Sequence, residues 1–213
     1  MPSLSDPIPT TATTLPVEPL LVGESDLAAE PPRPHDAPST WSEVWTQPFD
    51  ETTRTVLDVG TASGKVALLL ANLGFEVTGI DPSDRLLDQA RRKLSDHPHP
   101  PDLRWGAIDA PPFAPSSFDA LVARYELWTL RDLTTALTLW REQLRPGGVL
   151  VAVDGPGSTS EGIGPVIAAL ELSGFEQVRA ELLPDILELD LAGARAPDHS
   201  PGQQYRFTAR RPR

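Results

Sequence analysis

Cysteine is absent from the 213-residue sequence. This absence excludes disulfide bonds, thiolate metal sites and a cysteine nucleophile. The sequence also lacks an apolar run long enough to span a bilayer. Glu18 and several prolines interrupt the apolar patch near the N-terminus, a pattern unlike that of a signal peptide. We therefore expect a cytoplasmic protein.

Positive charge is also scarce, with 18 Lys and Arg residues against 30 Asp and Glu residues and a formal net charge of −12. Because proteins bind nucleic acids and anionic membranes largely through Lys and Arg, we expect neither as a partner. The basic group at the C-terminus is interpreted as a solvated strand end; it comprises Arg206, Arg210, Arg211 and Arg213. No His and carboxylate residues have metal-ligand spacing, so we predict no metal site.

The length fits one domain. Residues 1–38 are rich in Pro, Thr and Ser and show no sustained periodicity, which predicts disorder; alternatively, they form a cover that orders over a ligand. The domain is expected to span 39–213. It begins with a helix whose apolar face carries Trp41, Val44, Trp45 and Phe49, capped by Ser39 or Thr40 with Glu43 in its first turn. That helix either packs on the domain edge or forms a lid over a cofactor.

From Thr55 onward, short apolar strands alternate with helical patterns. The expected strands are 55–59, 75–80, 103–108, 118–123, 149–153, 175–182 and 204–209. The expected helices are 66–73, 82–94, 130–144 and 165–173, and Arg145-Pro-Gly-Gly148 reads as a helix stop and a tight turn. This alternation predicts an α/β fold with a doubly wound, mostly parallel sheet, whose last two strands pair antiparallel. Residues 184–203 give no readable pattern.

The turn Gly60-Thr-Ala-Ser-Gly64 joins the first strand to the first helix of this alternation. Such a turn lets a ligand approach the backbone and the free N–H groups of the helix start. Asp58 precedes the turn, and Asp81 ends the next strand, where a carboxylate can accept hydrogen bonds from both hydroxyls of a ribose. The alternative is an ordinary strand-to-helix turn with Asp81 as a helix cap.

The glycine spacing discriminates between two cofactors that share this geometry. A dinucleotide fold requires G-x-G-x-x-G, and here Ala62 and Lys65 replace two of the three glycines. S-adenosylmethionine (SAM) has no phosphate and needs only room for its methionine moiety, which Gly60 and Gly64 with the small Thr61 and Ala62 between them provide. The spacing therefore favours SAM over NAD.

Four segments in the appropriate order resemble the motifs of the class I SAM-dependent methyltransferases, in particular their small-molecule branch. They are Val56-Leu-Asp-Val-Gly-Thr-Ala-Ser-Gly64, Gly79-Ile-Asp-Pro-Ser83, Gly106-Ala-Ile-Asp-Ala-Pro-Pro-Phe113 with Ser117-Phe-Asp119, and Leu144-Arg-Pro-Gly-Gly-Val-Leu150. The resemblance implies a Rossmann-like, seven-stranded sheet with an antiparallel last strand. It also implies that Asp81, with Pro82, holds the SAM ribose, and that Asp109 and Ala110 meet the adenine.

The segment Arg124-Tyr-Glu-Leu-Trp-Thr-Leu-Arg131 is similar to a stretch in a bacterial subgroup of this family. Two departures from the family pattern are Ala62 at the middle glycine and Lys65 at a usually apolar or small position. The His expected near Tyr125 is also absent, which argues against a histidine-based mechanism at this point.

A methyltransferase needs a general base only if the acceptor must lose a proton, because SAM carries the hard chemistry. Our candidate catalytic residues are Tyr125 and Glu126, with Asp154 and His35 as further bases; alternatively, Tyr125 and Glu126 are only first-turn or loop residues. Arg124 either meets the methionine carboxylate or pairs with Glu126. Trp128 and Trp140 are candidates to line an acceptor pocket, although Trp140 is better suited to packing a helix.

The leading hypothesis is thus an enzyme that methylates O or N of a small molecule. Three alternatives remain: a protein methyltransferase acting on a basic partner, a SAM-binding or S-adenosylhomocysteine-binding module without catalysis, and an NAD-dependent oxidoreductase, which the glycine spacing disfavours.

Overall fold

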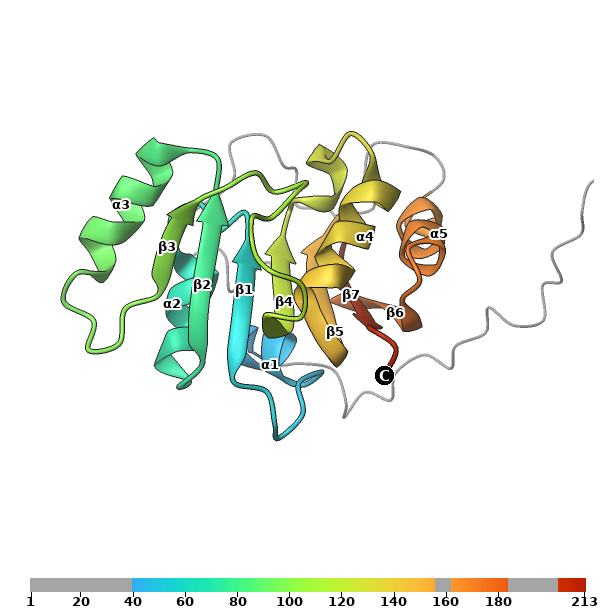
Figure 1. Cartoon of the computed structure of the whole chain (residues 1–213), viewed down its shortest axis with the longest axis horizontal. Helices are drawn as coiled ribbons and strands as arrows, with labels where there is room; N and C mark the ends of the chain where they lie inside the picture. Colours follow the sequence, from blue (N-terminus) through green and yellow to red (C-terminus); the bar gives the residue numbers. More distant parts are fainter. Residues whose placement is uncertain (1–39, 156–161, 184–202) are drawn as a thin grey trace, which may run out of the picture. The chain divides into compact units, whose positions relative to one another are not determined.

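The computed structural model describes residues 40–155, 162–183 and 203–213. The expected disorder of residues 1–38 and almost all of the unread segment 184–203 lie outside these ranges. Within them, one seven-stranded sheet has the order β3-β2-β1-β4-β5-β7-β6 (Figure 1). The strands are β1 (Thr55–Val59), β2 (Glu76–Asp81), β3 (Asp102–Trp105), β4 (Phe118–Arg124), β5 (Leu144–Asp154), β6 (Glu176–Leu183) and β7 (Gln204–Arg210).

The strands β1 to β5 are parallel, and β7 pairs antiparallel with both β5 and β6. The expected seven-stranded, mostly parallel sheet is therefore confirmed. Its helices are α1 (Trp41–Thr46), α2 (Lys65–Asn72), α3 (Asp84–Leu94), α4 (Leu133–Gln143) and α5 (Gly164–Leu172), with a short 3-10 helix, η1 (Leu127–Thr129).

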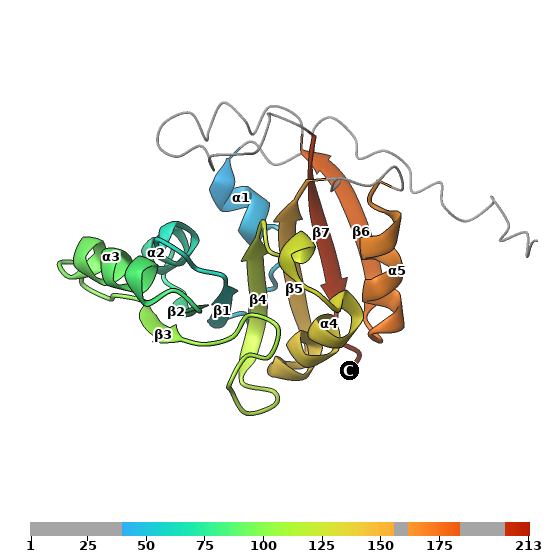
Figure 2. The same cartoon turned by 90° about the horizontal axis from the view of Figure 1, so that it is seen from above.

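Helices cover both faces of the sheet and create two hydrophobic cores. On one face, α1, α2 and α3 pack against side chains such as Val56, Val122 and Val151. On the other face, α4 and α5 pack against Leu57, Leu121 and their neighbours; Figure 2 shows α1 and α4 on opposite sides of the sheet. Because successive side chains of a strand point to opposite faces, a strand buried on both faces reads as a continuous apolar run.

Helix α1 is fixed by the capping box that the sequence predicts. The Thr40 hydroxyl accepts from the Glu43 N–H, and the Glu43 carboxylate accepts from the Thr40 N–H. Val44 and Trp45 are fully buried against the sheet, so the packing interpretation of this helix is the correct one for these two residues. Trp41 at the start of α1 is only partly buried and stacks on Trp45.

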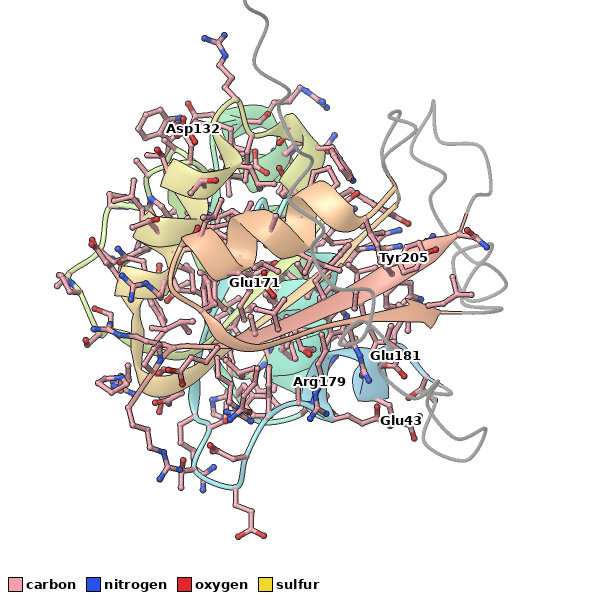
Figure 3. All side chains as sticks on the ribbon, turned by 90° about the vertical axis from the view of Figure 1, so that its right-hand side faces the viewer. Glu43, Asp132, Glu171, Arg179, Glu181 and Tyr205 are labelled. Atoms are coloured by element: carbon pink, nitrogen blue, oxygen red, sulfur yellow. The ribbon has the colours of Figure 1, made fainter. Side chains whose placement is uncertain are left out.

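The interpretation of the C-terminal arginines as a solvated strand end is wrong for Arg206. Its side chain is 8% exposed and ion-pairs with Glu181 on β6. The Arg206 Nη1 also donates to the Val44 carbonyl, 3.2 Å away, and to Gln47 Oε1, 3.0 Å away. Figure 3 shows Glu181 close to Glu43 of α1. Arg206 therefore ties α1 to the antiparallel edge of the sheet, because charged donors satisfy the carbonyls that a helix end leaves unpaired.

Two other arginines of this group also bind the backbone. Arg210 donates to the carbonyls of Gly147 and Pro48 at 3.0 and 2.8 Å. Arg211 donates to the Glu142 carbonyl and to Ser116 Oγ, each at 3.1 Å. Arg206, Arg210 and Arg211 thus bind within the fold, whereas Arg213 is exposed.

Several predicted boundaries differ from the structure. The helix expected at 130–144 begins only at Leu133, because the Asp132 side chain accepts from the Thr135 N–H and caps it. Strand β3 ends at Trp105 rather than at residue 108. The Arg145-Pro-Gly-Gly148 segment lies within β5, where it causes a register shift against β4.

Trp140 packs α4 against the sheet, which is the role that the sequence favours over lining an acceptor pocket. It is fully buried, and its indole N–H donates to the Ile108 carbonyl at 2.6 Å. This bond holds the β3–β4 connection onto α4. No helix in the described ranges is both long and apolar enough to cross a membrane.

The buried ion pair predicts a large stability effect. We expect Arg206→Ala to lower the free energy of unfolding by about 3–5 kcal/mol, because removal of one partner leaves the Glu181 carboxylate uncompensated. Arg179→Ala, at an exposed position of the same strand as Glu181, should change it by less than about 0.5 kcal/mol. Urea unfolding followed by tryptophan fluorescence measures both. Equal effects of the two variants would contradict the anchoring role of Arg206.

Candidate functional site

The strand order reverses between β1 and β4. In parallel α/β sheets, ligands bind outside the carboxyl ends of the strands at such a switch point. Here that edge brings together the Gly60 turn after β1, Asp81 at the end of β2, Glu126 after β4 and Asp154 at the end of β5. The predicted glycine turn and the predicted acidic residues therefore meet in one place.

The turn after β1 has a left-handed backbone at three positions. The φ angles are 72° at Gly60, 47° at Ala62 and 75° at Gly64. The N–H groups of Gly60 and Thr61 both donate to the Ile80 carbonyl at 2.9 Å. Left-handed φ costs a non-glycine residue about 1–2 kcal/mol, so Ala62 adopts a strained conformation where a glycine would be at ease.

Asp81 ties this turn to β2. One carboxylate oxygen accepts from the Ala62 N–H at 2.9 Å, and the other accepts from the Ser83 N–H at 2.8 Å. The cap of α3 is Ser83, whose hydroxyl accepts from the Leu86 N–H, so Asp81 itself is not the helix cap. Since each carboxylate oxygen accepts more than one hydrogen bond, Asp81 keeps capacity for a ligand hydroxyl.

Asp58 lies beneath the turn and is 2% exposed. It accepts from the Thr61 hydroxyl at 2.7 Å. Burial raises the pKa of the Asp58 carboxyl to about 7; the hydrogen bonds from Thr61 and the Ala67 N–H oppose this, and the charge of Asp81 adds to it. Asp58 therefore holds the turn against the start of α2 from below.

Glu126 lies over the same turn from above. A methyl group on Gly60 would overlap the Glu126 carboxylate, so the two residues are in close contact and Gly60 must lack a side chain. The Thr129 hydroxyl lies 3.3 Å from Glu126 Oε2. Burial raises the pKa of Glu126 to about 7; the Thr129 hydrogen bond opposes this, and the charges of Asp81, Asp154 and Asp58 add to it.

Asp154 closes the group at the end of β5 and is 3% exposed. Its carboxylate accepts from the N–H groups of Leu127 and Gly155 at 3.0 and 2.8 Å. It therefore fixes the start of η1, immediately after Glu126. Trp128 is pinned beside it, because its indole N–H donates to the Gly155 carbonyl at 2.8 Å.

Arg124 points to the α1 face of the sheet. Its guanidinium lies 4.3 Å from the Trp41 ring centre and 4.9 Å from the Tyr125 ring centre, within cation–π range. No sequence pattern indicates the Trp41 contact, because the two residues are distant in the chain. Tyr125 has a left-handed φ of 61°, and such strain in a non-glycine residue concentrates at functional sites.

The remaining predicted site residues are exposed or lie outside the described residues. Asp109 and Ala110 lie exposed in the β3–β4 connection. Pro82 is exposed, and its carbonyl accepts from the Trp105 indole at 3.0 Å. Lys65 is exposed at the start of α2, and His35 lies outside the described residues. Among the described residues, no three His or carboxylate side chains are grouped so as to hold a metal ion.

Comparisons with known proteins agree on one family. Residues 57–152 match the family model of a methyltransferase domain. The chain is 34% identical over 97 residues to a ubiquinone biosynthesis O-methyltransferase of Methylocella silvestris, which covers 46% of this chain and 38% of that protein. It is 28% identical over 155 residues to a demethylmenaquinone methyltransferase of Chlorobaculum parvum, which covers 71% of this chain and 58% of that one.

A solved structure supports the same fold. The phosphoethanolamine N-methyltransferase 2 of Haemonchus contortus, in complex with S-adenosyl-L-methionine, superposes with a TM-score of 0.65 at 18% identity, covering 83% of this chain and 54% of that one. Residues 57–152 of this chain are thus a methyltransferase domain, and the fold is the Rossmann-like fold of SAM-dependent methyltransferases. The chain spans only about 40 to 60% of the length of the two curated relatives that it matches.

The strained turn after β1 yields a stability prediction. We expect Ala62→Gly to raise the free energy of unfolding by about 0.5–1 kcal/mol, because relief of the left-handed strain exceeds the entropic cost of glycine. Ala168→Gly, at an exposed position of helix α5, should lower it by about 1 kcal/mol. Urea unfolding of wild type and both variants measures the two changes in the free energy of unfolding, which should have opposite signs. A loss of stability in Ala62→Gly would contradict the strain.

The raised pKa of Glu126 predicts a pH-dependent effect of neutralising it. Between the ordinary value of 4.5 and about 7, the folded state binds more protons than the unfolded chain, so the free energy of unfolding falls as pH rises. Glu126→Gln removes this loss. The difference in the free energy of unfolding between the variant and wild type should be about 1–3 kcal/mol larger, in favour of the variant, at about pH 8 than at about pH 4.5. Urea unfolding at both pH values measures this, and a pH-independent difference would be inconsistent with a buried, proton-binding Glu126.

Proposed function

We propose that this chain transfers the methyl group of SAM to an oxygen or nitrogen atom of a small molecule. The main support is that the Asp81 carboxylate binds the Gly60 turn at the switch point of the sheet, in a chain that contains a methyltransferase domain. The names of the two curated relatives, both methyltransferases of quinone biosynthesis, support a small acceptor. The net charge of −12 argues against a nucleic-acid acceptor.

The residues present fit SAM. Gly60 has no side chain, so a ligand can approach its backbone on the side where the Glu126 carboxylate lies. Asp81, with its remaining acceptor capacity, would hold the ribose hydroxyls. By family resemblance, Asp109 and Ala110 would lie at the adenine and Arg124 at the methionine carboxylate. When bound, SAM supplies a methyl group on a sulfonium, ready for direct displacement.

The protein's own contribution is alignment and proton handling. Orienting two reactants is worth about 7–11 kcal/mol in favourable cases. Glu126, with its pKa of about 7, and Tyr125 are the candidates to accept a proton from the acceptor, because a base works best with a pKa near the operating pH. Asp154 serves this site by fixing η1 through its two backbone hydrogen bonds.

One observation favours a second function. Glu126 lies directly over Gly60 and Ala62 is strained, so a site that binds SAM or S-adenosylhomocysteine weakly, without catalysis, is the alternative. A methyltransferase acting on a basic protein is compatible with the negative charge of the chain.

Ligand binding tests the proposal first. We expect SAM and S-adenosylhomocysteine to raise the melting temperature and NAD to leave it unchanged; a ligand at about 100 times its dissociation constant adds about 2.7 kcal/mol to the native state. Formation of S-adenosylhomocysteine in the presence of phenols, quinols or amines would then separate the enzyme from a binding module. Stabilisation by neither SAM species would exclude both.

The ribose role of Asp81 has its own test. Asp81→Asn should weaken SAM binding about tenfold or more, because charge-assisted hydrogen bonds are worth about 1.5–3 kcal/mol. Asp88→Asn, on the exposed side of α3 where Asp88 pairs with Arg91, should leave the affinity unchanged. Isothermal titration calorimetry measures both affinities. An unchanged affinity in Asp81→Asn would remove Asp81 from the binding site.

A further inference from the structure

The four carboxylates of the site differ in the hydrogen bonds that they accept. Asp58 accepts from the Thr61 hydroxyl and the Ala67 N–H. Asp81 and Asp154 each accept from two backbone N–H groups. Each of these three carboxylates therefore has a structural task in shaping the turns after β1, β2 and β4. Their carboxylate oxygens are hydrogen-bonded within the fold, as buried polar groups require.

Glu126 has no comparable compensation among the described residues. Its one side-chain hydrogen bond there is with the Thr129 hydroxyl at 3.3 Å, and that hydroxyl lies closer, at 2.7 Å, to the Glu126 carbonyl. A hydroxyl has a single proton to donate, so the Thr129 hydroxyl stabilises the Glu126 carboxylate only weakly. The charges of Asp81, Asp154 and Asp58 all act unfavourably on it. A cation placed here would relieve both the repulsion and the burial.

The position of this carboxylate matters as much as its environment. Glu126 contacts Gly60 at the switch point between β1 and β4, so a ligand lying on the glycine turn must lie against this side chain. SAM carries a sulfonium, an ammonium and a carboxylate, and so one net positive charge. Methyl transfer breaks the bond between sulfur and the methyl carbon and leaves the electron pair on sulfur. S-adenosylhomocysteine is therefore a thioether with no net charge.

We propose that Glu126 is the counter-charge by which this site prefers the cationic methyl donor over its neutral product. This inference rests on the proposed function and adds a specificity-determining role to it. The carboxylate attracts the donor before transfer, and that attraction ends when the positive charge on sulfur disappears. Product release is thereby favoured without any movement of the fold.

The test compares the affinities of wild type and Glu126→Gln for SAM and for S-adenosylhomocysteine by isothermal titration calorimetry at about pH 8, above the pKa of the carboxyl. We expect the variant to bind SAM about tenfold more weakly and S-adenosylhomocysteine within about threefold of wild type. The ratio of the two affinities is the readout, because a purely structural role of Glu126 would change both equally.

The matched control is Glu171→Gln. Glu171 is exposed in the last turn of α5 and is labelled on that helix in Figure 3; because α5 returns from the carboxyl end of β5, this turn lies toward the opposite edge of the sheet from the site. The substitution removes the same charge from the protein and should leave the ratio unchanged. A shift as large as that of Glu126→Gln would show that net charge alone acts, and would overturn the proposal.

The other outcomes each overturn it differently. Equal loss of both affinities in Glu126→Gln means that the side chain only shapes the site. Equal gain of both means that it obstructs the glycine turn. If wild type binds neither ligand, the proposed function falls and this inference falls with it; if wild type binds both and the ratio does not change, only this inference falls.

Discussion

The hydrogen bond from the Ala62 N–H to Asp81 is the interaction on which the site depends. It joins the turn after β1 to the end of β2, while the Gly60 and Thr61 N–H groups bind the Ile80 carbonyl one residue earlier. The turn is thereby held flat against the neighbouring strand, in a left-handed conformation that Ala62 does not favour. Such strain persists only where the surroundings over-determine the backbone, and here Asp81 and the buried Asp58 do so from two sides.

A second consequence is an accumulation of negative charge at one edge of the sheet. Parallel strands bring their carboxyl ends to the same edge, and three of these strands end in or close to Asp58, Asp81 and Asp154. Backbone N–H groups and a hydroxyl donate hydrogen bonds to these carboxylates, which lowers the cost of burying them. Glu126, which follows β4, has only the Thr129 hydroxyl as a side-chain hydrogen-bond partner among the described residues. The local structure and the candidate chemistry thus share one physical cause.

The antiparallel edge shows a different use of charge. Arg206 is buried between β6, β7 and α1 and bonds to the backbone of the helix as well as to Glu181. The arginines near the C-terminus were predicted to be solvated because a basic cluster at a strand end usually is. Nothing local in the sequence distinguishes a buried arginine from an exposed one, since the carbonyls that it binds belong to residues some 160 positions away.

The sequence by itself determined the strands and helices, the mostly parallel sheet and the turn at Gly60, because periodicity and glycine punctuation are local properties of the chain. It also pointed to Asp81, since an acidic residue at that spacing follows from the strand–helix–strand repeat. Only the tertiary structure decided that β3 ends at Trp105, that Arg124 stacks on Trp41 and that Glu126 covers Gly60. Each of these depends on which distant segments pack together, and the side-chain pattern of a single segment carries no record of its neighbours.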